Sequence, residues 1–471
     1  MKNSLSRRGH RADSKSRRSV LHLLPTVPAP PLPSQRPLLP GNLTTKARRA
    51  DRASSAPPDY PPGQLRIALY SHDAMGLGHM RRNLLIARTL AGPALKASIL
   101  MIAGAGEATA FGLPPGVDCL TLPALRKESD GSYHARNLSI ALPELIALRG
   151  SAIGATLEAF HPDVLIVDKM PRGIGQELDS ALARLCAYGR TRCVLGLRDV
   201  LDDPETVHRE WDRDGNEHAI RRYYDAIWIY GDPQVYDLVR EYELSADIAK
   251  KARYTGYLDQ RLRLAAHDGE RVDLLKSLGL PPGRLMLCLV GGGQDGSRLA
   301  EAFSEAALPQ DAVGVILTGP HMPVEVQQRL HRRASQNPRM RVLEFVPEPA
   351  YLMSRADRVV AMGGYNTTCE ILSFGKPALL VPRVKPRLEQ WIRAERLRDM
   401  GLLDVLHPDE LHAAALTQWM ARPTRSVCDA RRYIDMDGLS HLPALLSELV
   451  APPSSSPVTH SYGEGAWHVS N

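Results

Sequence analysis

The sequence is poor in aromatic residues, has few cysteines and lacks a long apolar run. Phe, Trp and Tyr make up 5% of the 471 residues, so aliphatic side chains must fill the cores, which favours layered α/β domains over an aromatic-rich β-sandwich. The six cysteines form no CxxC pair and have no histidine cluster at zinc-finger spacing. This excludes a zinc finger and indicates reduced cysteines in the cytosol. No apolar run approaches the ~20 residues that span a bilayer.

Common cofactor signatures are also missing. Neither half of the chain combines GxGxxG with a ribose-binding acid about 20 residues further on, and GxxxxGK[ST] does not occur, so an NAD-dependent enzyme and a P-loop protein are disfavoured. No DxD motif has the context of a metal-bound diphosphate, and Asp202-Asp203 is interpreted as the start of a helix. We therefore expect neither a metal nor a cofactor.

The excess of positive charge is confined to the first sixty residues. The whole chain has a formal net charge of +7. Residues 1–60 hold 12 Lys and Arg against 3 Asp and Glu, whereas the remainder holds 47 against 49. The remainder is near neutral and does not indicate a basic groove, so we expect no nucleic-acid partner.

Both ends of the sequence have the composition of disordered segments. Residues 1–62 are rich in Pro, Ser and Arg, and residues 451–471 are similar. Such stretches bury too little apolar surface to offset their chain entropy. The apolar run at 21–25 is too short for a secretory signal. We interpret residues 1–62 as a disordered leader or an extension beyond the true start, with an organelle transit peptide as the alternative, and 451–471 as a disordered tail.

Between these ends, short apolar runs alternate with longer amphipathic segments such as 139–160. Strands are predicted at 66–70, 97–102, 164–167, 193–197 and 226–229 and, after a linker at 257–283, at 285–290, 313–317, 341–345, 358–361 and 378–381. This alternation predicts parallel sheets with helices on both faces. The fold class is α/β, with Rossmann-like domains at 63–258 and 259–450 that face a cleft. Ligands in such sheets bind beyond the carboxyl ends of the strands.

The first candidate site follows the strand at 285–290. Val-Gly-Gly-Gly-Gln-Asp-Gly at 290–296 lies between that strand and a helix that starts near Ser297. Glycines let the backbone present its N–H groups, and the helix terminus adds positive potential, so the loop predicts a diphosphate cradle. A tight strand–helix turn without a ligand is the alternative.

The second candidate site has the same place after a later strand. Gly363 and Gly364 allow close approach of a ligand, and Asn366 or Thr367 can cap the following helix. Glu370 lies three residues after Thr367. It either completes a capping box with that residue or accepts hydrogen bonds from two ribose hydroxyls.

A third candidate site begins the helix after the strand at 378–381. Glu389 and Gln390 stand at its start and are expected to face the cleft. Adjacent carboxylate and amide groups suit sugar hydroxyls, which both donate and accept hydrogen bonds. A solvated polar turn is the alternative.

Together these segments resemble the donor half of GT-B glycosyltransferases, and the resemblance makes 259–450 the donor domain and 63–258 the acceptor domain. The segments run in the order GGGQDG, GGYNTTCEILSFGKPALLVP and RLEQWIRAERL. The chain resembles glycosyltransferase family 28 in particular, and within it a group of predicted bacterial glycosyltransferases, over 65–450 and most strongly over 285–400. The peptidoglycan N-acetylglucosaminyl transferase of this family has two glutamines where this chain has Glu389-Gln390, so N-acetylglucosamine is not assumed as the donor sugar.

The resemblance implies residues that bind a nucleoside-diphosphate sugar. Backbone amides of the glycine loop contact the diphosphate, and Glu370 contacts the ribose. Glu389 and Gln390 contact the transferred sugar, and the nucleobase lies at the end of the strand at 341–345. The implied donor-binding residues are Gly291, Gly292, Gly293, Gln294, Phe345, Val346, Gly363, Gly364, Tyr365, Asn366, Thr367, Glu370, Glu389 and Gln390.

In GT-B transferases a glycine-containing loop of the first domain faces the donor, and residues 73–80 fit that position. Gly76 and Gly78 belong to this loop, and Arg81 follows one turn into the helix, where it meets an anionic acceptor or only water. His79 is the candidate catalytic base, because its unperturbed pKa lies near neutrality. A histidine that caps the helix or only orients a phosphate is the alternative.

Two strand-end carboxylates are alternative bases. Asp168 closes the strand at 164–167, and Asp199 follows the strand at 193–197. Carboxyl ends of strands in this domain point into the cleft, so either group can act as the base or bind the acceptor. Asp199 can equally form an ion pair with its neighbour Arg198.

These residues predict transfer of a hexosyl group from a nucleoside-diphosphate sugar, UDP-linked by resemblance, to an unidentified acceptor hydroxyl, with inversion and without a metal. The alternatives are a nucleotide-sugar 2-epimerase, a nucleotide-sugar hydrolase, or an inactive protein that binds the sugar nucleotide. The acceptor is a lipid carrier, a saccharide or a small molecule. We expect a cytoplasmic monomer or weak dimer, with peripheral membrane contact through the leader or the stretch 138–148 as a further hypothesis.

Overall fold

The computed structural model describes residues 64–73, 78–104, 112–127, 132–265, 274–292, 295–346, 348–423 and 429–451. All of these belong to one unit, Pro61–Asn471. The leader at 1–62, the tail beyond Ala451 and three predicted site residues, Gly76, Gly293 and Gln294, lie outside the described residues. The predictions made for them remain predictions.

The first half of the described chain forms a seven-stranded parallel sheet in the order β3-β2-β1-β6-β7-β8-β9. The strands are β1 (Arg66–Ser71), β2 (Ser98–Ala103), β3 (Val117–Thr121), β6 (Val164–Asp168), β7 (Arg192–Arg198), β8 (Ala226–Tyr230) and β9 (Ala252–Tyr254). A hairpin of β4 (Leu125–Lys127) and β5 (Tyr133–Ala135) stands apart from it. The strand order changes direction between β1 and β6, which places a ligand crevice at the carboxyl ends of these two strands.

The second half of the described chain forms a six-stranded parallel sheet in the order β12-β11-β10-β13-β14-β15. The strands are β10 (Arg284–Leu289), β11 (Ala312–Leu317), β12 (Met340–Leu343), β13 (Arg358–Ala361), β14 (Ala378–Leu380) and β15 (Asp404–Val405). Here the order changes direction between β10 and β13. These are the two strands that precede the predicted glycine-rich sites.

Helices connect the strands of both sheets. In the first half they are α1 (Gly78–Leu90), α2 (Leu142–Phe160), the 3-10 turn η2 (Ile174–Gln176), α3 (Asp179–Tyr188), α4 (Pro204–Asp214), α5 (Asn216–Tyr223), α6 (Leu238–Glu241) and α7 (Ala246–Ala249). In the second half they are α8 (Leu262–Ala265), α9 (Leu274–Ser277), α10 (Ser297–Glu305), α11 (Val324–Ser335), α12 (Ala350–Arg355), α13 (Tyr365–Ser373), α14 (Glu389–Asp399), the 3-10 turns η3 (Pro408–Glu410) and η4 (Ala430–Arg432), α15 (Ala413–Ala421) and α16 (Gly438–Val450).

Alternate residues of each central strand enter different cores. Ile67 and Leu69 of β1 pack in the same apolar cluster as residues of α1 and α16, whereas Ala68 and Tyr70 pack with α2 and α3 on the opposite face. In the second sheet, alternate residues of β10 pack in the same way, and one face is covered by α10, α11 and α15. Burial on both faces explains why these strands are almost continuously apolar.

The predicted α/β class with two parallel sheets is confirmed. Each predicted strand corresponds to an observed one with small shifts at the ends, the largest being the prediction at 341–345, which is β12 at Met340–Leu343. The hairpin of β4 and β5 was not predicted, and neither were three strands of the parallel sheets, β3, β9 and β15. All three stand at sheet edges, and none of them is fully buried, so their sequences lack the apolar run that marks a central strand.

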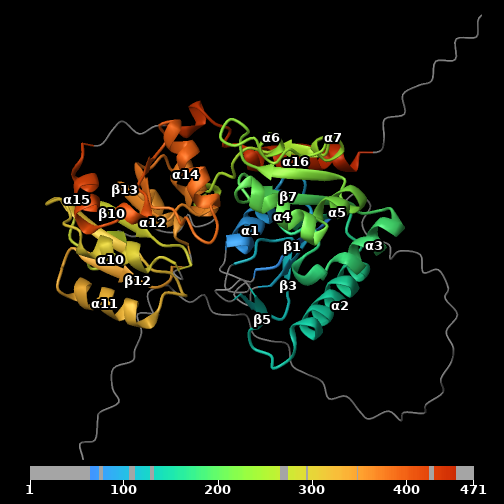
Figure 1. Ribbon diagram of the computed structural model, residues 1–471, viewed down its shortest axis with the longest axis horizontal. Coiled ribbons are helices and arrows are strands. Elements are labelled where there is room, and N and C mark those ends of the chain that lie inside the picture. The colour runs from blue at the N-terminus through green and yellow to red at the C-terminus, as the bar shows by residue number, and fades with distance from the viewer. Residues whose placement is uncertain are drawn as a thin grey trace, which may run out of the picture. The chain divides into compact units, whose positions relative to one another are not determined.

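The last helix of the chain returns to the first sheet. Leu439, Leu442 and Leu446 of α16 belong to the apolar cluster that contains α1, and Figure 1 shows α16 beside the elements of the first half. The return is fixed by a hydrogen bond from the Tyr257 amide to the Asp435 carbonyl (2.8 Å). The division of the chain at 258/259 and its end at 450 stay predictions.

Ion pairs of α14 and the residues before it tie the second half to the first. Arg393 bonds both oxygens of Asp199 (2.6–3.0 Å), and neither side chain of this pair is exposed. Arg387, just before α14, bonds Asp202 (2.9 Å) and Glu210 (2.6 Å) of the first half. A buried ion pair such as Arg393–Asp199 demands good geometry from both partners, so it helps to specify how the two halves meet.

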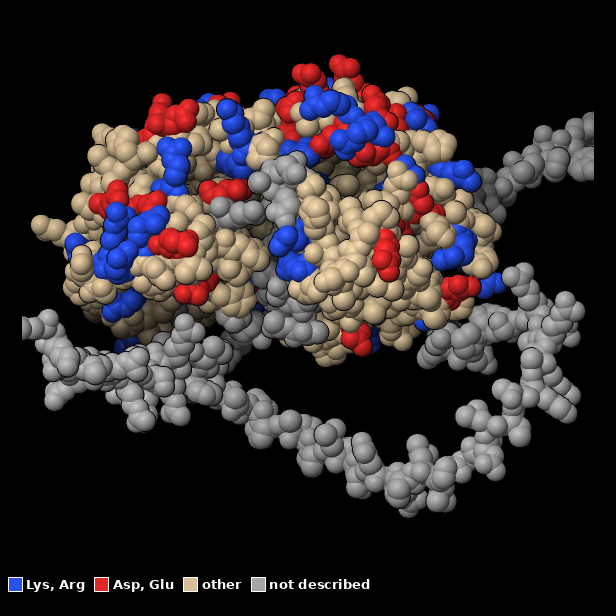
Figure 2. All heavy atoms as spheres, turned by 60° about the horizontal axis from the view of Figure 1, so that its bottom comes forward, with Lys and Arg blue, Asp and Glu red and all other residues tan. Residues whose placement is uncertain are grey.

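The surface of the described residues carries charges of both signs. Lys and Arg are interspersed with Asp and Glu on the face shown in Figure 2, in keeping with the near-neutral composition of residues 61–471. Within the described ranges, no helix has both the length and the apolar character needed to cross a bilayer.

Candidate active site

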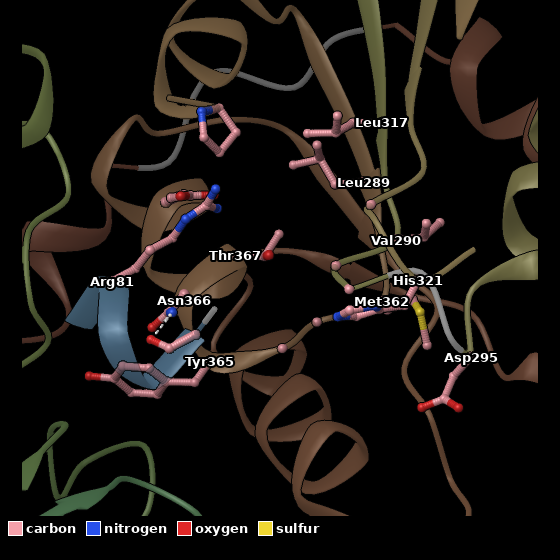
Figure 3. Close-up of a pocket in the computed structure, with 18 of the residues that line it drawn as sticks. Arg81, Leu289, Val290, Asp295, Leu317, His321, Met362, Tyr365, Asn366 and Thr367 are labelled. Carbon is pink, nitrogen blue, oxygen red and sulfur yellow. Dashed lines mark hydrogen bonds between the residues drawn. The ribbon is translucent and has the colours of Figure 1, made fainter. Parts of the chain in front are cut away.

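A cavity of about 340 Å³ lies where the carboxyl ends of the central strands of both sheets meet. Its volume is in the range of small-molecule sites. The first half contributes Gly78, His79, Arg81, Arg82 and Arg198, and the second half contributes Leu289, Val290, Gly291, Gly292, Asp295, Leu317, Gly319, Pro320, His321, Glu344, Phe345, Val346, Pro349, Met362, Gly363, Gly364, Tyr365, Asn366, Thr367, Glu370, Arg383 and Gln390. In Figure 3, Arg81 lies on one side of the cavity and Val290 and His321 on the other.

The glycine loop after β10 is held against the loop after β11. Gly291 has a φ of 65°, and the His321 amide donates to the Gly292 carbonyl (3.0 Å). A Cβ on Gly319 would lie 2.3 Å from the Gly291 oxygen, so only glycine fits there. The segment 291–296 has the glycine spacing GxGxxG, but β11 ends in Leu317 and is followed by Thr-Gly rather than by a ribose-binding acid.

The second glycine-rich segment begins α13 without a side-chain cap. Gly363 has a φ of 82°, and Gly364 is the N-cap residue with no side-chain hydrogen bond. The expectation that Asn366 or Thr367 caps the helix, with Glu370 completing a capping box, is therefore wrong. Asn366 Nδ2 instead donates to the Gly78 carbonyl at the start of α1 (2.8 Å), a contact drawn as a dashed line in Figure 3.

Glu370 is buried, 4% exposed, and still lines the cavity. Its Oε1 accepts a hydrogen bond from Arg263 NH1 at 2.5 Å. Because the capping role is excluded, the carboxylate is available for the other interpretation, binding of ribose hydroxyls.

Glu389 and Gln390 occupy different places although they are neighbours at the start of α14. Gln390 lines the cavity, and its Oε1 accepts from the Arg383 amide (3.0 Å). Glu389 is buried, does not line the cavity and bonds Arg383 through Oε1 (2.8 Å). Burial raises the pKa of Glu389, but Arg198 and Arg383 outweigh burial and hold it below its ordinary value. Glu389 thus contacts a cavity-lining arginine rather than the cavity.

His79 lies at the carboxyl ends of β1 and β6 and is bonded to Asp168. His79 Nδ1 is 2.5 Å from Asp168 Oδ2, and Arg82 bonds Oδ1 of the same carboxylate. Burial lowers the pKa of His79 to about 4, against the opposing effect of Asp168. Burial raises the pKa of Asp168, but Arg82 and then His79 outweigh it and lower that pKa. At neutral pH the pair is a carboxylate and a neutral imidazole.

Asp199 is held away from the cavity. It is fully buried, bonds Arg393 with both oxygens, and accepts from the Tyr257 hydroxyl (2.8 Å). The expected pairing of Asp199 with its neighbour Arg198 is wrong, because the two side chains of consecutive residues point to opposite sides of the chain. This geometry argues against Asp199 as the base.

Arg198, at the end of β7, lines the cavity, and part of its guanidinium is left without a hydrogen bond to the described residues. Its Nε is buried and has no hydrogen-bond partner among the described residues. Burial lowers the pKa of Arg198, and although Glu389 raises it, Arg393 and Arg82 lower it further. A buried cation of this kind is stabilised by an anion that binds in the cavity.

Sequence reasoning missed further polar residues of the cavity, among them His321, Asp295 and Arg383. Arg383 bonds Asp295 (2.8 Å) as well as Glu389. His321 and Arg383 each follow the carboxyl end of a strand, β11 and β14. Inspection of the residues after every predicted strand, beyond the glycine-rich ones, is the signal that would have found them.

Comparison with known proteins supports the resemblance seen in the motifs. Residues 286–418 match the Glycosyltransferase family 28 C-terminal domain. The UDP-N-acetylglucosamine–N-acetylmuramyl-(pentapeptide) pyrophosphoryl-undecaprenol N-acetylglucosamine transferase of Rubrobacter xylanophilus is 28% identical over 170 residues, which are 36% of this chain and 47% of the relative. The chain therefore spans about half the length of this curated relative.

Two solved structures share the arrangement of both sheets. The calicheamicin glycosyltransferase CalG4 has a TM-score of 0.52 at 15% identity, over 82% of this chain and 97% of that structure. A Listeria monocytogenes protein assigned as a UDP-N-acetylglucosamine 2-epimerase has a TM-score of 0.51 at 13% identity, over 82% and 96%. At these identities the likeness concerns the fold. Residues 286–418 therefore form a glycosyltransferase family 28 C-terminal domain, and the chain as a whole has the GT-B fold.

Proposed function

We propose that the protein transfers a hexosyl group from a nucleoside-diphosphate sugar to the hydroxyl of an acceptor. One observation carries the proposal. Two glycine-rich segments at helix starts and the carboxylate of Glu370 line the same cavity as His79 of the other half, whose Nδ1 contacts Asp168. A donor site and a base that face each other across one cavity are what glycosyl transfer requires.

The donor is placed by the second half of the chain. Backbone amides around Gly291, Gly292 and the start of α13 meet the diphosphate, since α10 and α13 direct their positive ends to this part of the cavity. Glu370 accepts from the ribose hydroxyls. The nucleobase stacks near Phe345 and Val346, and Gln390 contacts the transferred sugar.

The leaving diphosphate is stabilised by fixed charges. Arg198 supplies a cation from the first half, opposite the glycine loops, and it lacks a full set of protein partners. Charge that develops on the leaving oxygen meets groups already in place, so little reorganisation is needed during the reaction.

The acceptor is activated by His79. With Nδ1 bonded to Asp168, the neutral ring has its Nε2 lone pair available for the acceptor proton. The acceptor oxygen attacks the anomeric carbon as its proton passes to Nε2. The bond from that carbon to the diphosphate oxygen breaks, and its electron pair leaves with the diphosphate. Attack from the face opposite the leaving group inverts the anomeric configuration.

The donor site is tested with UDP, GDP, ADP and TDP by thermal shift and calorimetry on the wild type and Glu370→Ala. We expect one nucleoside diphosphate to stabilise the wild type, and to do so at least tenfold more weakly in the variant, about the value of a hydrogen bond to a charged group. If no nucleoside diphosphate binds, the proposal fails.

The reaction is tested by incubating the matching nucleotide sugar with and without a panel of acceptors. If the protein transfers the sugar, the donor should be consumed much faster when an acceptor is present, and a glycosylated acceptor should form. Consumption at the same rate without an acceptor, giving an epimer or free sugar, would instead establish the epimerase or hydrolase alternative. Binding without turnover under any condition would establish an inactive binding protein.

For the acceptor, we propose that lipid-linked saccharides be tested first, because the curated relative acts on a pyrophosphoryl-undecaprenol substrate. An acceptor of this kind predicts binding to liposomes that contain anionic lipid, with part of the attraction from the basic leader. Deletion of residues 1–60 should then weaken liposome binding measured by sedimentation. Unchanged binding would remove the leader from this role.

A further inference from the structure

We infer that Arg263, outside the motifs that identify the donor site, is a positioning residue that orients Glu370 for the ribose diol and thereby makes the site selective for ribonucleotides. The inference rests on the proposed function, since it assumes that Glu370 meets the ribose. It adds a residue to which the sequence motifs assign no role. Arg263 belongs to α8, in the segment that connects the two halves.

Arg263 bridges two carboxylates. Its NH1 donates to Oε1 of Glu370 at 2.5 Å, and its NH2 and Nε donate to Oε1 (2.5 Å) and Oε2 (3.1 Å) of Glu348. The exposed fractions are 6% for Arg263, 5% for Glu370 and 19% for Glu348. A planar guanidinium held on one edge by Glu348 presents its remaining N–H in a fixed direction, which a flexible ammonium cannot do.

The other partners of Arg263 are themselves anchored. Glu348 Oε1 accepts from the Ala350 amide at the start of α12 (3.0 Å). The side-chain Oε1 of Gln260 accepts a hydrogen bond from Arg263 NH1 (3.1 Å). The backbone amide of Gln260 donates to the hydroxyl of Ser373 (3.0 Å). Ser373 lies at the end of α13, the helix that carries Glu370, so the connecting segment and this helix are fixed to each other.

This arrangement limits how the carboxylate of Glu370 can turn. Arg263 contacts Oε1, and Oε2 takes no part in that contact. A carboxylate locked at one oxygen keeps its other acceptor positions in one plane, where the two adjacent ribose hydroxyls can both donate. Arg263 also balances the charge of Glu370, whose burial would otherwise be unfavourable. Loss of Arg263 leaves the acceptor present but loosely oriented, so the contribution of the 2′-hydroxyl should fall.

The test compares ribo- and 2′-deoxyribonucleotides. Dissociation constants for UDP and 2′-deoxy-UDP, GDP and 2′-deoxy-GDP, and ADP and 2′-deoxy-ADP are measured by calorimetry on the full chain. The wild type should prefer the ribose form of its nucleotide by roughly tenfold, the value of one hydrogen bond to a charged acceptor. Arg263→Gln should reduce this ratio to within about threefold, and Arg263→Lys should lie between the two. Arg284→Gln, which removes an exposed ion pair of the same half, should leave the ratio unchanged.

A second variant guards against a folding defect. Glu348→Gln keeps Arg263 but removes the charge that anchors it, and should also lower the ratio while urea unfolding stays cooperative. A ratio that stays at the wild-type value in Arg263→Gln and in Glu348→Gln overturns the positioning role. Tighter UDP binding by Arg263→Gln also overturns it, since Arg263 would then compete with the ribose for Glu370.

Failure of the proposed function has a different signature. If the wild type binds the ribo and deoxy forms of every pair equally, or binds none of them, Glu370 does not meet a ribose and the donor-site assignment itself is lost. If the wild type discriminates and the Arg263 variants discriminate equally well, the donor site stands and only the role of Arg263 is lost.

Discussion

Burial and one carboxylate set the pKa and the orientation of the His79 imidazole. Burial lowers its pKa to about 4, and the 2.5 Å contact with Asp168 directs Nδ1 away from the cavity. Arg82 bonds the same carboxylate, so Asp168 stays ionised and orients the ring rather than competing with it for the acceptor proton. A neutral ring of fixed tautomer is therefore present across the physiological pH range.

His79→Ala should lower kcat by about 10²- to 10⁴-fold, the contribution of a general base, while UDP binding stays near the wild-type value.

The proton acceptor is the neutral ring of His79, which is lost as the pH falls through its pKa. The acid limb of kcat/KM should therefore lie near pH 4 and not near the 6.5 of an ordinary histidine. Steady-state rates from pH 3.5 to 8 measure this. The exposed His134→Ala is the control, and an acid limb at 6.5 would contradict the assignment.

Arg198 lines the cavity, and its buried Nε has no hydrogen-bond partner among the described residues. Arg198→Gln should weaken UDP binding by roughly 10- to 100-fold but UMP binding by much less, if the guanidinium meets the second phosphate. Calorimetry with uridine, UMP and UDP measures how much each phosphate adds to the binding free energy. Arg192→Gln, at the opposite exposed end of β7, is the matched control. Equal loss for UMP and UDP would place Arg198 at the first phosphate instead.

Among the elements, the proposed donor site depends on two strand–helix turns whose positive φ favours glycine. Gly291 and Gly363 have φ values of 65° and 82°, which place other residues under strain. Gly319 has a φ of 76°, and a Cβ there would meet the glycine loop from the neighbouring strand–helix connection. The shape of the proposed diphosphate cradle therefore depends on a residue outside it.

Gly319→Ala should displace the loop after β10 and weaken UDP binding by about tenfold or more, since amide positions are held to fractions of an ångström in a preorganised site. Gly401→Ala separates this effect from backbone strain, because Gly401 also has a positive φ (73°) but open space around its Cβ. Both variants should lose about 1 kcal/mol of stability or more. Only Gly319→Ala should lose affinity in calorimetry, and equal affinities would show that the loop tolerates the change.

At the scale of the whole molecule, the two halves are joined by polar contacts as well as by the returning helix α16. Arg393 and Asp199 are fully buried and lie 194 residues apart in the sequence. Tyr257, in the segment between the halves, bonds the same carboxylate. This cluster stands next to the cavity without lining it, so it sets the relation between donor and acceptor residues.

Removal of one partner of the Arg393–Asp199 ion pair should strongly destabilise the protein. Arg393→Met leaves Asp199 buried and uncompensated, and should lower the free energy of unfolding by about 3–5 kcal/mol in urea denaturation. Asp199→Asn should cost a similar amount. The exposed pair Arg284–Asp311 serves as the comparison, where Arg284→Gln should change stability by no more than about 1 kcal/mol. A loss below 1 kcal/mol for Arg393→Met would mean that water reaches the cluster.

The local features of this protein could be predicted from its amino-acid sequence. Continuous apolar runs bounded by polar segments marked the central strands, because strands buried on both faces need them. Glycine-rich segments after the strands that became β10 and β13 marked the cavity, because such turns need positive φ and present amides at a helix start. These features depend on residues close together in the chain, and so their pattern can be read from it.

Which distant side chains meet depends on how the folded chain packs. Asp199 bonds Arg393 rather than its neighbour Arg198, Glu370 bonds Arg263 rather than the cap of its own helix, and Gln390 lines the cavity where Glu389 does not. A charged group pairs with whichever opposite charge the packing of sheets and helices brings within about 3 Å, and burial makes that choice decisive. Such partners lie 107 and 194 residues apart, and no local pattern in the sequence records them.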